Sequence, residues 1–181
     1  MIETARLSLR LPEPKDATSI AHFYSHNRDH LQPWSPLWTD SLFSEEFWRN
    51  QVRRFKEEFD AGLSARLFVF KKGEALLIGT ASLTQIQRGP LHSAVLGYAL
   101  AASEQGQGYM TEAVKAAVEF AFERLSLHRV EAGYQPHNRR SAEVLKRAGF
   151  SVEGYARDFL LINGRWEDHI LTAITNPRWR G

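Results

Sequence analysis

A glycine-rich turn that runs directly into a long amphipathic helix constrains this chain more than any other feature. Residues 103–122 read S-E-Q-G-Q-G-Y-M-T-E-A-V-K-A-A-V-E-F-A-F, with Val114, Val118 and Phe122 at helical spacing. The run A-V-L-G-Y-A-L at residues 94–100 comes immediately before it and is typical of a buried strand. The pattern therefore predicts a strand, a glycine turn and a helix in succession.

Two glycines, Gly106 and Gly108, remove side chains where the backbone enters this helix. The first N–H groups of a helix lack partners within it and lie at the positive end of its dipole, so a bare helix start binds phosphate well. The alternative is that the glycines only permit a tight turn, because a lone G-x-G is weak evidence. No G-K-[ST] follows and Thr111 replaces a third glycine, which excludes a nucleotide-triphosphate loop and a dinucleotide fingerprint.

The rest of the chain carries strand and helix signals in turn. Strands are expected at residues 6–11, 66–71, 76–84, 94–100 and 129–134, and helices at residues 16–27, 44–61 and 138–147. Residues 152–162 and 166–174 flank Asn163-Gly164 and predict a terminal hairpin. Residues 31–38 hold two prolines and two tryptophans and are expected to form a loop. We expect a mixed α/β (α+β) layer fold in one domain spanning residues 1–181.

Composition limits the classes of function. The chain has 181 residues, of which 43% are hydrophobic and 24% charged, as in a globular domain. The sequence has no apolar run of membrane-spanning length, no signal-peptide core and no cysteine, so we expect a cytoplasmic protein without membrane contact. The seven histidines lack zinc-ligand spacing, which predicts no metal. A net charge of +2 argues against sequence-specific nucleic-acid binding, but it permits docking on acidic surfaces such as ribosomal RNA.

A second constellation is P-H-N-R-R-S-A-E-V-L-K-R-A-G-F at residues 136–150. Asn138 stands at a predicted helix start with Ser141 three residues on. Asn is among the best N-caps, and the same position also presents Asn138 and Ser141 to a ligand. Arg139 and Arg140 either meet a phosphate or are solvated.

The glycine turn E-Q-G-Q-G-Y-M-T-E-A and the segment N-R-R-S-A-E-V-L-K-R-A-G-F stand one strand apart. Together they resemble the acyl-CoA-binding core of the Gcn5-related N-acetyltransferases. The blocks N-R-D-H-L-Q-P-W-S-P and E-G-Y-A-R-D-F-L-L-I-N-G-R-W-E-D-H are similar to the Rim branch, which acetylates the N-terminal amines of ribosomal proteins. The resemblance implies a mostly antiparallel twisted sheet with a splayed strand pair, flanked by helices.

The resemblance also implies acetyl-CoA as co-substrate. The turn amides would hold its pyrophosphate, the strands around Tyr98 and Gly133 would splay around the pantetheine, and the helix-start side chains would reach the sulfur end. The cofactor-binding residues carried over are Leu100, Gln105, Gly106, Gln107, Gly108, Tyr109, Met110, Asn138 and Ser141.

Two departures from the family pattern stand out. Ser103 occupies the position where a Gln or Arg is frequent, three residues before the first glycine. Leu145 occupies the position of a frequent tyrosine general acid, so we expect Ser141 to replace it as the acid for the leaving thiolate.

The implied reaction is direct attack of an amine on the thioester. An α-amino group titrates near 7.7–8 and a lysine amine near 10.4, so an α-amine needs only a weak base. A carboxylate acting through one water would suffice. Asp158 is the first candidate base and Glu104 the second, the alternative for both being a structural carboxylate. Tyr98 and Tyr134 either face the core or position the amine or the acetyl carbonyl.

The expected acceptor is the N-terminal alanine of a small-subunit ribosomal protein, met on the ribosomal protein itself or on the pre-ribosomal small subunit. Trp34 and Trp38 either cover core or form a stiff wall of the acceptor cleft. One alternative is an acetyltransferase for another protein N-terminus or a small-molecule amine. A second is a ribosome-assembly or regulatory binding protein that keeps the fold, since Arg139, Arg140, Lys146 and Arg147 make a basic cluster.

Overall fold

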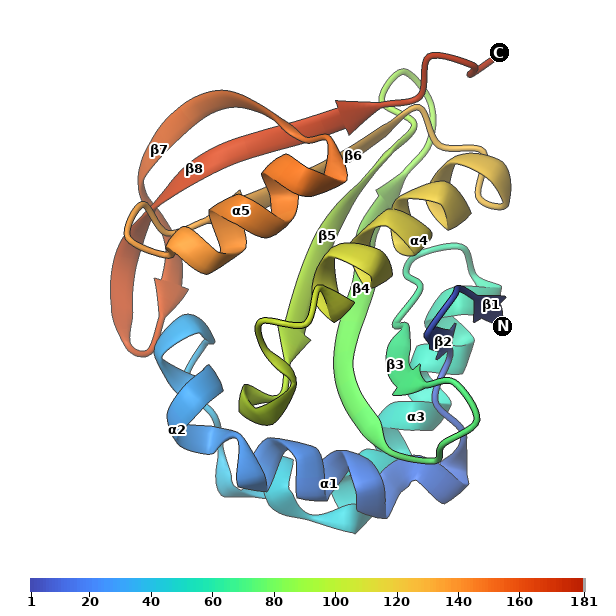
Figure 1. Ribbon diagram of the computed structural model, residues 1–181, viewed down its shortest axis with the longest axis vertical. Coiled ribbons are helices and arrows are strands. Elements are labelled where there is room, and N and C mark those ends of the chain that lie inside the picture. Colours follow the sequence, from blue (N-terminus) through green and yellow to red (C-terminus); the bar gives the residue numbers. More distant parts are fainter. Residues whose placement is uncertain (181) are drawn as a thin grey trace.

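One eight-stranded sheet forms the centre of the protein, in the strand order β1-β2-β3-β4-β5-β6-β8-β7 (Figure 1). The computed structural model describes residues 1–180. The strands are β1 (Ile2–Glu3), β2 (Leu7–Arg10), β3 (Phe68–Lys71), β4 (Leu77–Gln87), β5 (Ser93–Leu100), β6 (Arg129–Tyr134), β7 (Ser151–Ile162) and β8 (Arg165–Thr175). The helices are α1 (Ala17–His26), α2 (Arg28–Leu31), α3 (Glu45–Asp60), α4 (Tyr109–Glu123) and α5 (Arg139–Ala148).

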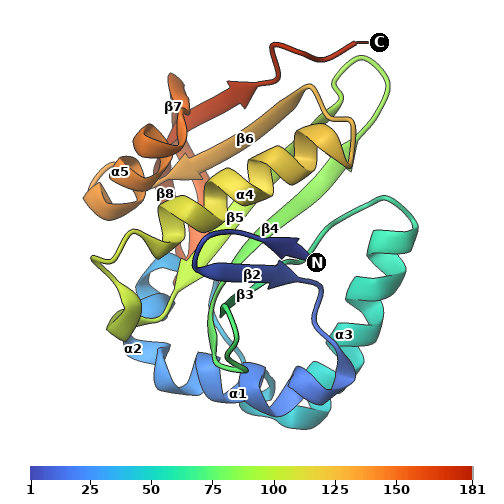
Figure 2. The ribbon, with the colours of Figure 1, turned by 45° about the vertical axis from the view of Figure 1, so that its right-hand side comes forward.

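Helices cover both faces of this sheet. Along β3, Val69 belongs to the core beneath α4 and α5, whereas Phe68 and Phe70 belong to the core beneath α1 and α3. Successive side chains of a strand point to opposite faces, so the two cores lie on opposite sides of the sheet. In both ribbon views α4 lies across one face of the sheet, and α1 and α3 lie away from that face (Figures 1 and 2).

The helix ends follow the capping residues in the sequence. The Ser44 hydroxyl accepts a hydrogen bond from the Phe47 amide and begins α3. Asn138 begins α5 in the same way, and Gly149, at φ +94°, ends it in the left-handed conformation.

The predicted helices and strands are confirmed within a few residues. The sequence reading missed the two-residue strand β1, and the expected loop at residues 31–38 contains the 3-10 turn Gln32–Trp34.

Strands β5 and β6 are the parallel pair of this otherwise antiparallel sheet, and they separate along their length. Residues Ser93 to Val95 pair with Arg129 to Glu131, and the pairing ends there. Beyond that point β5 continues against β4 as far as Leu100, while β6 continues against β8. The predicted splayed pair is therefore confirmed, and it leaves one edge of the second half of β5 without a strand partner.

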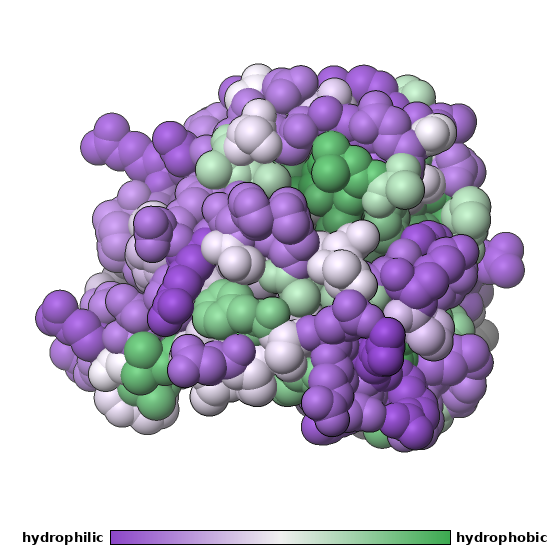
Figure 3. Space-filling model, turned by 90° about the horizontal axis from the view of Figure 1, so that it is seen from below, coloured by the Kyte–Doolittle hydropathy of each residue, from purple (hydrophilic) through white to green (hydrophobic). Residues whose placement is uncertain are grey.

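The terminal hairpin of β7 and β8 reaches back to the 31–38 loop. At its tip the Asn163 amide donates to the Ser35 carbonyl over 2.8 Å. Several apolar side chains of the hairpin and the loop are exposed: Leu37, Tyr155, Phe159, Leu160, Leu161 and Trp166. Seen from below, the surface is mainly hydrophilic, and its apolar side chains gather in separate patches (Figure 3). In the part of the chain that the structure describes, no helix is long and apolar enough to cross a bilayer.

Candidate active site

A cleft of about 850 Å³ lies where the glycine turn, the end of β5 and the start of α5 meet residues 30–34. Its volume is in the range of small-molecule and cofactor sites. Ten of the predicted cofactor-binding, acceptor-binding and catalytic residues line it: Trp34, Tyr98, Leu100, Gln105, Gly106, Gly108, Tyr109, Met110, Asn138 and Ser141. The fold thus brings together residues from positions 34 to 141 around one cavity.

The glycine turn leaves the start of α4 open. Gly106 and Gly108 have φ +77° and +80°, the left-handed region that glycine adopts without strain. Gly108 is the N-cap, and no side chain caps the helix there. The N–H groups of its first turn are consequently available to an anion at the positive end of the helix dipole.

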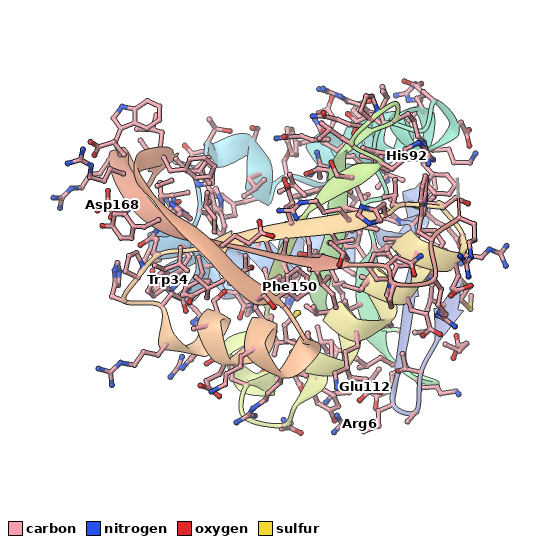
Figure 4. The ribbon with its side chains drawn as sticks, turned by 90° about the horizontal axis from the view of Figure 1, so that it is seen from above. Arg6, Trp34, His92, Glu112, Phe150 and Asp168 are labelled. Carbon is pink, nitrogen blue, oxygen red and sulfur yellow. The ribbon has the colours of Figure 1, made fainter. Side chains whose placement is uncertain are left out.

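A clamp from the turn between β1 and β2 holds the glycine turn from behind. The Arg6 guanidinium donates to the Gln107 carbonyl over 2.9 Å and to the Glu112 carboxylate over 2.7 Å, and Thr4 donates to the same carboxylate over 2.7 Å. Burial alone would raise the pKa of Glu112, but the hydrogen bonds from Thr4 and Arg6 outweigh it and lower the pKa. Arg6 and Glu112 lie side by side next to α4 in Figure 4.

Two hydroxyls meet at the floor of the cleft. The Tyr98 hydroxyl of β5 lies 2.5 Å from the Ser141 hydroxyl of α5 and 3.2 Å from the Ser141 carbonyl oxygen. Burial raises the pKa of Tyr98 to about 12, so its hydroxyl stays protonated at neutral pH. Asn138 holds Ser141 in place, because its side-chain oxygen accepts the Ser141 amide over 3.1 Å.

Positive charge borders the same cleft. Arg139, Arg140 and Arg147 line it, with Glu143 as the one carboxylate among the lining residues that the structure describes. The bare helix start, the arginines and the unpaired edge of β5 fit a long ligand that carries phosphates at one end and amides along its length.

Two histidines of the cleft were missed by the sequence reading. His30 Nε2 lies 2.9 Å from the Gln105 side-chain nitrogen, and the His137 ring lies 5.2 Å from the Trp34 ring. Both histidines stand inside segments that the sequence singled out as blocks. Nothing local in the sequence links residue 30 with residue 105, so only the folded chain reveals the contact.

Glu104, the second candidate base, does not line the cleft. Its side chain is buried, and its carboxylate forms an ion pair with Lys71 Nζ at 2.9 Å. Glu104 is therefore a structural carboxylate, the alternative to a catalytic base, and it ties the glycine turn to β3.

Asp158, the first candidate base, also lies outside the cleft lining. It is exposed, with φ +47°, in the irregular stretch of β7 between Ala156 and Leu160. Its amide donates to the Asp168 carboxylate over 2.8 Å, which stabilises the distorted strand. The geometry therefore does not support Asp158 as the base.

Three further candidates do not line the cleft. Trp38 packs edge-on against Tyr24, with ring centroids 5.3 Å apart, and so covers core. Tyr134 is half-buried against the core on the same side of the sheet as Tyr98. Gln107 offers its backbone carbonyl to Arg6, on the far side of the turn.

Among residues 1–180, no group of three or more His, Cys, Asp or Glu side chains is arranged to hold a metal ion.

Comparison with known proteins gives consistent results. Residues 6–151 match the family model described as acetyltransferase (GNAT) domain. The chain is 39% identical over 178 residues to the [ribosomal protein uS5]-alanine N-acetyltransferase of Escherichia coli, covering 98% of this chain and 92% of that protein.

Two solved structures share the fold closely. The ribosomal-protein-S5-alanine acetyltransferase from Vibrio fischeri superposes with a TM-score of 0.94 at 38% identity, covering 99% of this chain and 98% of the other. RimJ from Mycobacterium smegmatis, in complex with CoA-disulfide, superposes with a TM-score of 0.89 at 29% identity, covering 97% and 84%.

Proposed function

The chain belongs to the GNAT acetyltransferase family, and we propose that it acetylates the N-terminal α-amine of a ribosomal protein, with the N-terminal alanine of a small-subunit protein as acceptor. As a member of this family it is an acetyl-CoA-dependent N-acetyltransferase. The observation that supports the acceptor is the similarity to the uS5-alanine enzyme, which extends over 98% of the chain and includes the acceptor-side segments. The proposal treats residues 1–181 as one acetyltransferase domain.

The residues of the cleft fit acetyl-CoA, which supplies the activated acetyl thioester. We assign the pyrophosphate to the amides at the start of α4, next to the glycine turn, with Arg139 and Arg140 as cationic neighbours. The pantetheine amides are assigned to the free edge of β5 between Gly97 and Leu100, because that edge lacks a strand partner once β6 has turned away. Asn138 and Ser141 stand at the thioester end.

The Tyr98–Ser141 pair is proposed to serve the leaving thiolate. The amine nitrogen attacks the thioester carbon, the carbon–sulfur bond breaks, and the sulfur must then gain a proton. Ser141 can donate this proton or a hydrogen bond to the sulfur. The Tyr98 hydroxyl, 2.5 Å away, can then stabilise the negative charge that develops on the serine oxygen. This arrangement replaces the family's frequent tyrosine acid, since Leu145 at that position is fully buried.

The acceptor peptide is proposed to enter beside Trp34. This side chain lines the cleft, remains 38% exposed and contacts His137 across it. Trp34 therefore joins residues 28–34 to the loop before α5 and forms a flat wall on which a short N-terminal side chain can rest.

Intact-mass analysis tests this proposal. The purified protein is incubated with acetyl-CoA and unmodified small-subunit ribosomal proteins, beside peptides that begin with Ala or Ser and a peptide with a blocked N-terminus and an internal Lys. The expected result is an acetyl-sized gain on one Ala-starting protein, mapped to its α-amine. The blocked peptide is the matched control and should gain nothing.

The other outcomes separate the alternatives. If none of these acceptors gains the mass of an acetyl group while the protein still binds acetyl-CoA, the acceptor must be sought among other N-termini or small amines. A variant that binds no acetyl-CoA but still rescues ribosome assembly would instead favour a binding protein that keeps the fold.

A further inference from the structure

We propose that His30 accepts the proton of the attacking amine, and that Arg140, acting through Gln105, holds the imidazole neutral until the cofactor binds. This inference rests on the proposed function and names the base that the sequence reading sought among the carboxylates. Neither Asp158 nor Glu104 lines the cleft, whereas His30 does.

Three side chains from three elements form one hydrogen-bonded chain across the cleft. Arg140 Nη1 lies 2.7 Å from Gln105 Oε1, and Gln105 Nε2 lies 2.9 Å from His30 Nε2. A guanidinium only donates, so Gln105 presents its oxygen to Arg140 and its NH₂ group to His30. His30 Nε2 must then accept, which means that the ring is neutral and carries its hydrogen on Nδ1.

This hydrogen-bonded chain joins the pyrophosphate end of the cleft, where Gln105 stands, to the reacting end. Arg140 immediately precedes Ser141, whose hydroxyl contacts Tyr98. The His30 ring also interacts with the backbone of Leu100, two residues beyond Tyr98 on β5. Two residues of a strand span about 7 Å. His30 therefore lies about one such span along β5 from Tyr98, and we place it within reach of the same substrate through one water.

The surroundings of His30 disfavour its charged form. Burial lowers the pKa of His30, the Arg140 charge lowers it further, and the Leu100 backbone opposes both to a smaller degree. The other titratable side chains around the cleft are Tyr98, Tyr109, His137, Arg139, Glu143 and Arg147. Because the pKa of His30 lies below its ordinary value, the imidazole is a base at neutral pH.

Cofactor binding would release this base. The phosphates of acetyl-CoA compete with Gln105 for Arg140, and once Arg140 turns away the Gln105 amide is free to rotate off Nε2. After the amine nitrogen has bonded to the thioester carbon, its N–H bond breaks and the proton passes to His30 Nε2. The carbon–sulfur bond breaks, and the sulfur takes a proton from the Ser141–Tyr98 pair. Solvent then carries the proton from His30 back to this pair. The proton balance is closed.

The acceptor amine must be neutral to attack, and this requirement separates two kinds of amine. At pH 7 roughly a tenth of an α-amine with a pKa near 8 is neutral, whereas only a few parts in ten thousand of a lysine amine with a pKa near 10.4 are neutral. The reaction therefore favours N-terminal amines over lysine side chains through the pKa of the amine, in addition to any effect of shape.

The test is the pH dependence of kcat at saturating acetyl-CoA, measured with an Ala-starting peptide. The wild type should show an acidic limb with an apparent pKa below about 6.5. In His30→Gln the limb should disappear and kcat should fall about 10–100-fold, with the KM for acetyl-CoA changed less than about twofold. His26→Gln is the matched control, because His26 is exposed on α1, outside the cleft, and should keep the wild-type profile.

Two further measurements can refute the proposal. In the cofactor-free protein, Arg140→Gln should make His30 titrate at higher pH than in the wild type, because it removes the charge that disfavours protonated His30. Nitrogen NMR of the cofactor-free protein should show His30 as the Nδ1–H tautomer and titrating below about 6.5. An unchanged limb in a folded, acetyl-CoA-binding His30→Gln, or a His30 that is charged at neutral pH, would overturn the inference.

The same data separate this inference from the acceptor proposal. If the wild type acetylates a small amine and no protein N-terminus, the acceptor proposal fails, and the pH profiles of wild type and His30→Gln on that amine still decide the role of His30. If the wild type transfers acetyl to no amine, the NMR tautomer and pKa of His30 remain as the test.

Discussion

The hydroxyl of Tyr98 and the hydroxyl of Ser141 lie 2.5 Å apart, although the two residues are 43 positions apart in the chain. Tyr98 comes from the part of β5 that β6 leaves, and Ser141 comes from the first turn of the helix that follows β6. The divergence of two strands thus creates both the cleft and the hydroxyl pair at its floor.

Replacing Ser141 by alanine should lower turnover more than cofactor affinity. The serine hydroxyl is proposed to act on the sulfur as it leaves, so its loss is felt in the transition state. We expect kcat to fall about 10–100-fold, while the Kd for acetyl-CoA, measured by calorimetry, changes less than about threefold. An equal loss in both quantities would mean that Ser141 only binds.

Ionisation of Tyr98 should cost stability at alkaline pH. Burial raises its pKa to about 12, compared with about 10 in an unfolded chain. A group whose pKa is raised by folding stabilises the protein below its unfolded pKa, and this contribution is lost as the pH rises through the folded value. Relative to Tyr98→Phe, the wild type should therefore lose about 1 kcal/mol between pH 8 and about pH 11. Urea unfolding of both proteins at the two pH values measures the difference, and a constant difference would contradict the prediction.

Removal of the clamp behind the glycine turn should weaken cofactor binding. Arg6 donates to the Gln107 carbonyl and to Glu112, so Arg6→Ala should loosen the turn that presents the helix amides. We expect the KM for acetyl-CoA to rise about 3–10-fold with kcat nearly unchanged. Arg178→Ala removes a comparable exposed ion pair with Glu123, in the last turn of α4, and should leave the KM unchanged. Equal effects of the two variants would show that the clamp has no special role.

A methyl group at Gly106 should interfere with binding beyond its effect on stability. Gly106 and Gly73 have nearly the same φ, +77° and +79°, and no atom lies within 4 Å of an added Cβ at either position. Alanine at each should cost about 1 kcal/mol of stability, because the left-handed conformation is strained for an L side chain. Only Gly106→Ala should also weaken acetyl-CoA binding, since only that methyl group stands in the cleft. Thermal unfolding and calorimetric titration of both variants measure the two effects separately.

The two tryptophans of the 31–38 loop should behave differently. Trp34 lines the cleft, so Trp34→Ala should raise the KM for the acceptor peptide about tenfold with little change in stability. Trp38 packs against Tyr24, so Trp38→Ala should lower the free energy of unfolding by about 2 kcal/mol and leave the peptide KM close to wild type. A Trp34 variant that only loses stability would remove this side chain from the acceptor site.

Much of the fold was predictable because its signals are local. The alternation of residues 6–11, the Asn163-Gly164 turn and the Asn138 cap depend on neighbours within a few positions. The glycine turn is local in the same sense, since its left-handed angles and bare helix start follow from Gly106 and Gly108 themselves. The residue types alone therefore defined the succession of elements and the proposed phosphate end of the site.

The candidate base depended on tertiary structure, because it requires side chains that are distant along the chain. Glu104 and Asp158 carry suitable carboxylates, but packing pairs Glu104 with Lys71 and places Asp158 on an exposed bulge. His30 drew no attention in the sequence, since the Gln105 side chain that contacts it lies 75 residues away. Its low proton affinity arises from burial and from the Arg140 charge, and both exist only once α2, the glycine turn and α5 are packed around one cleft.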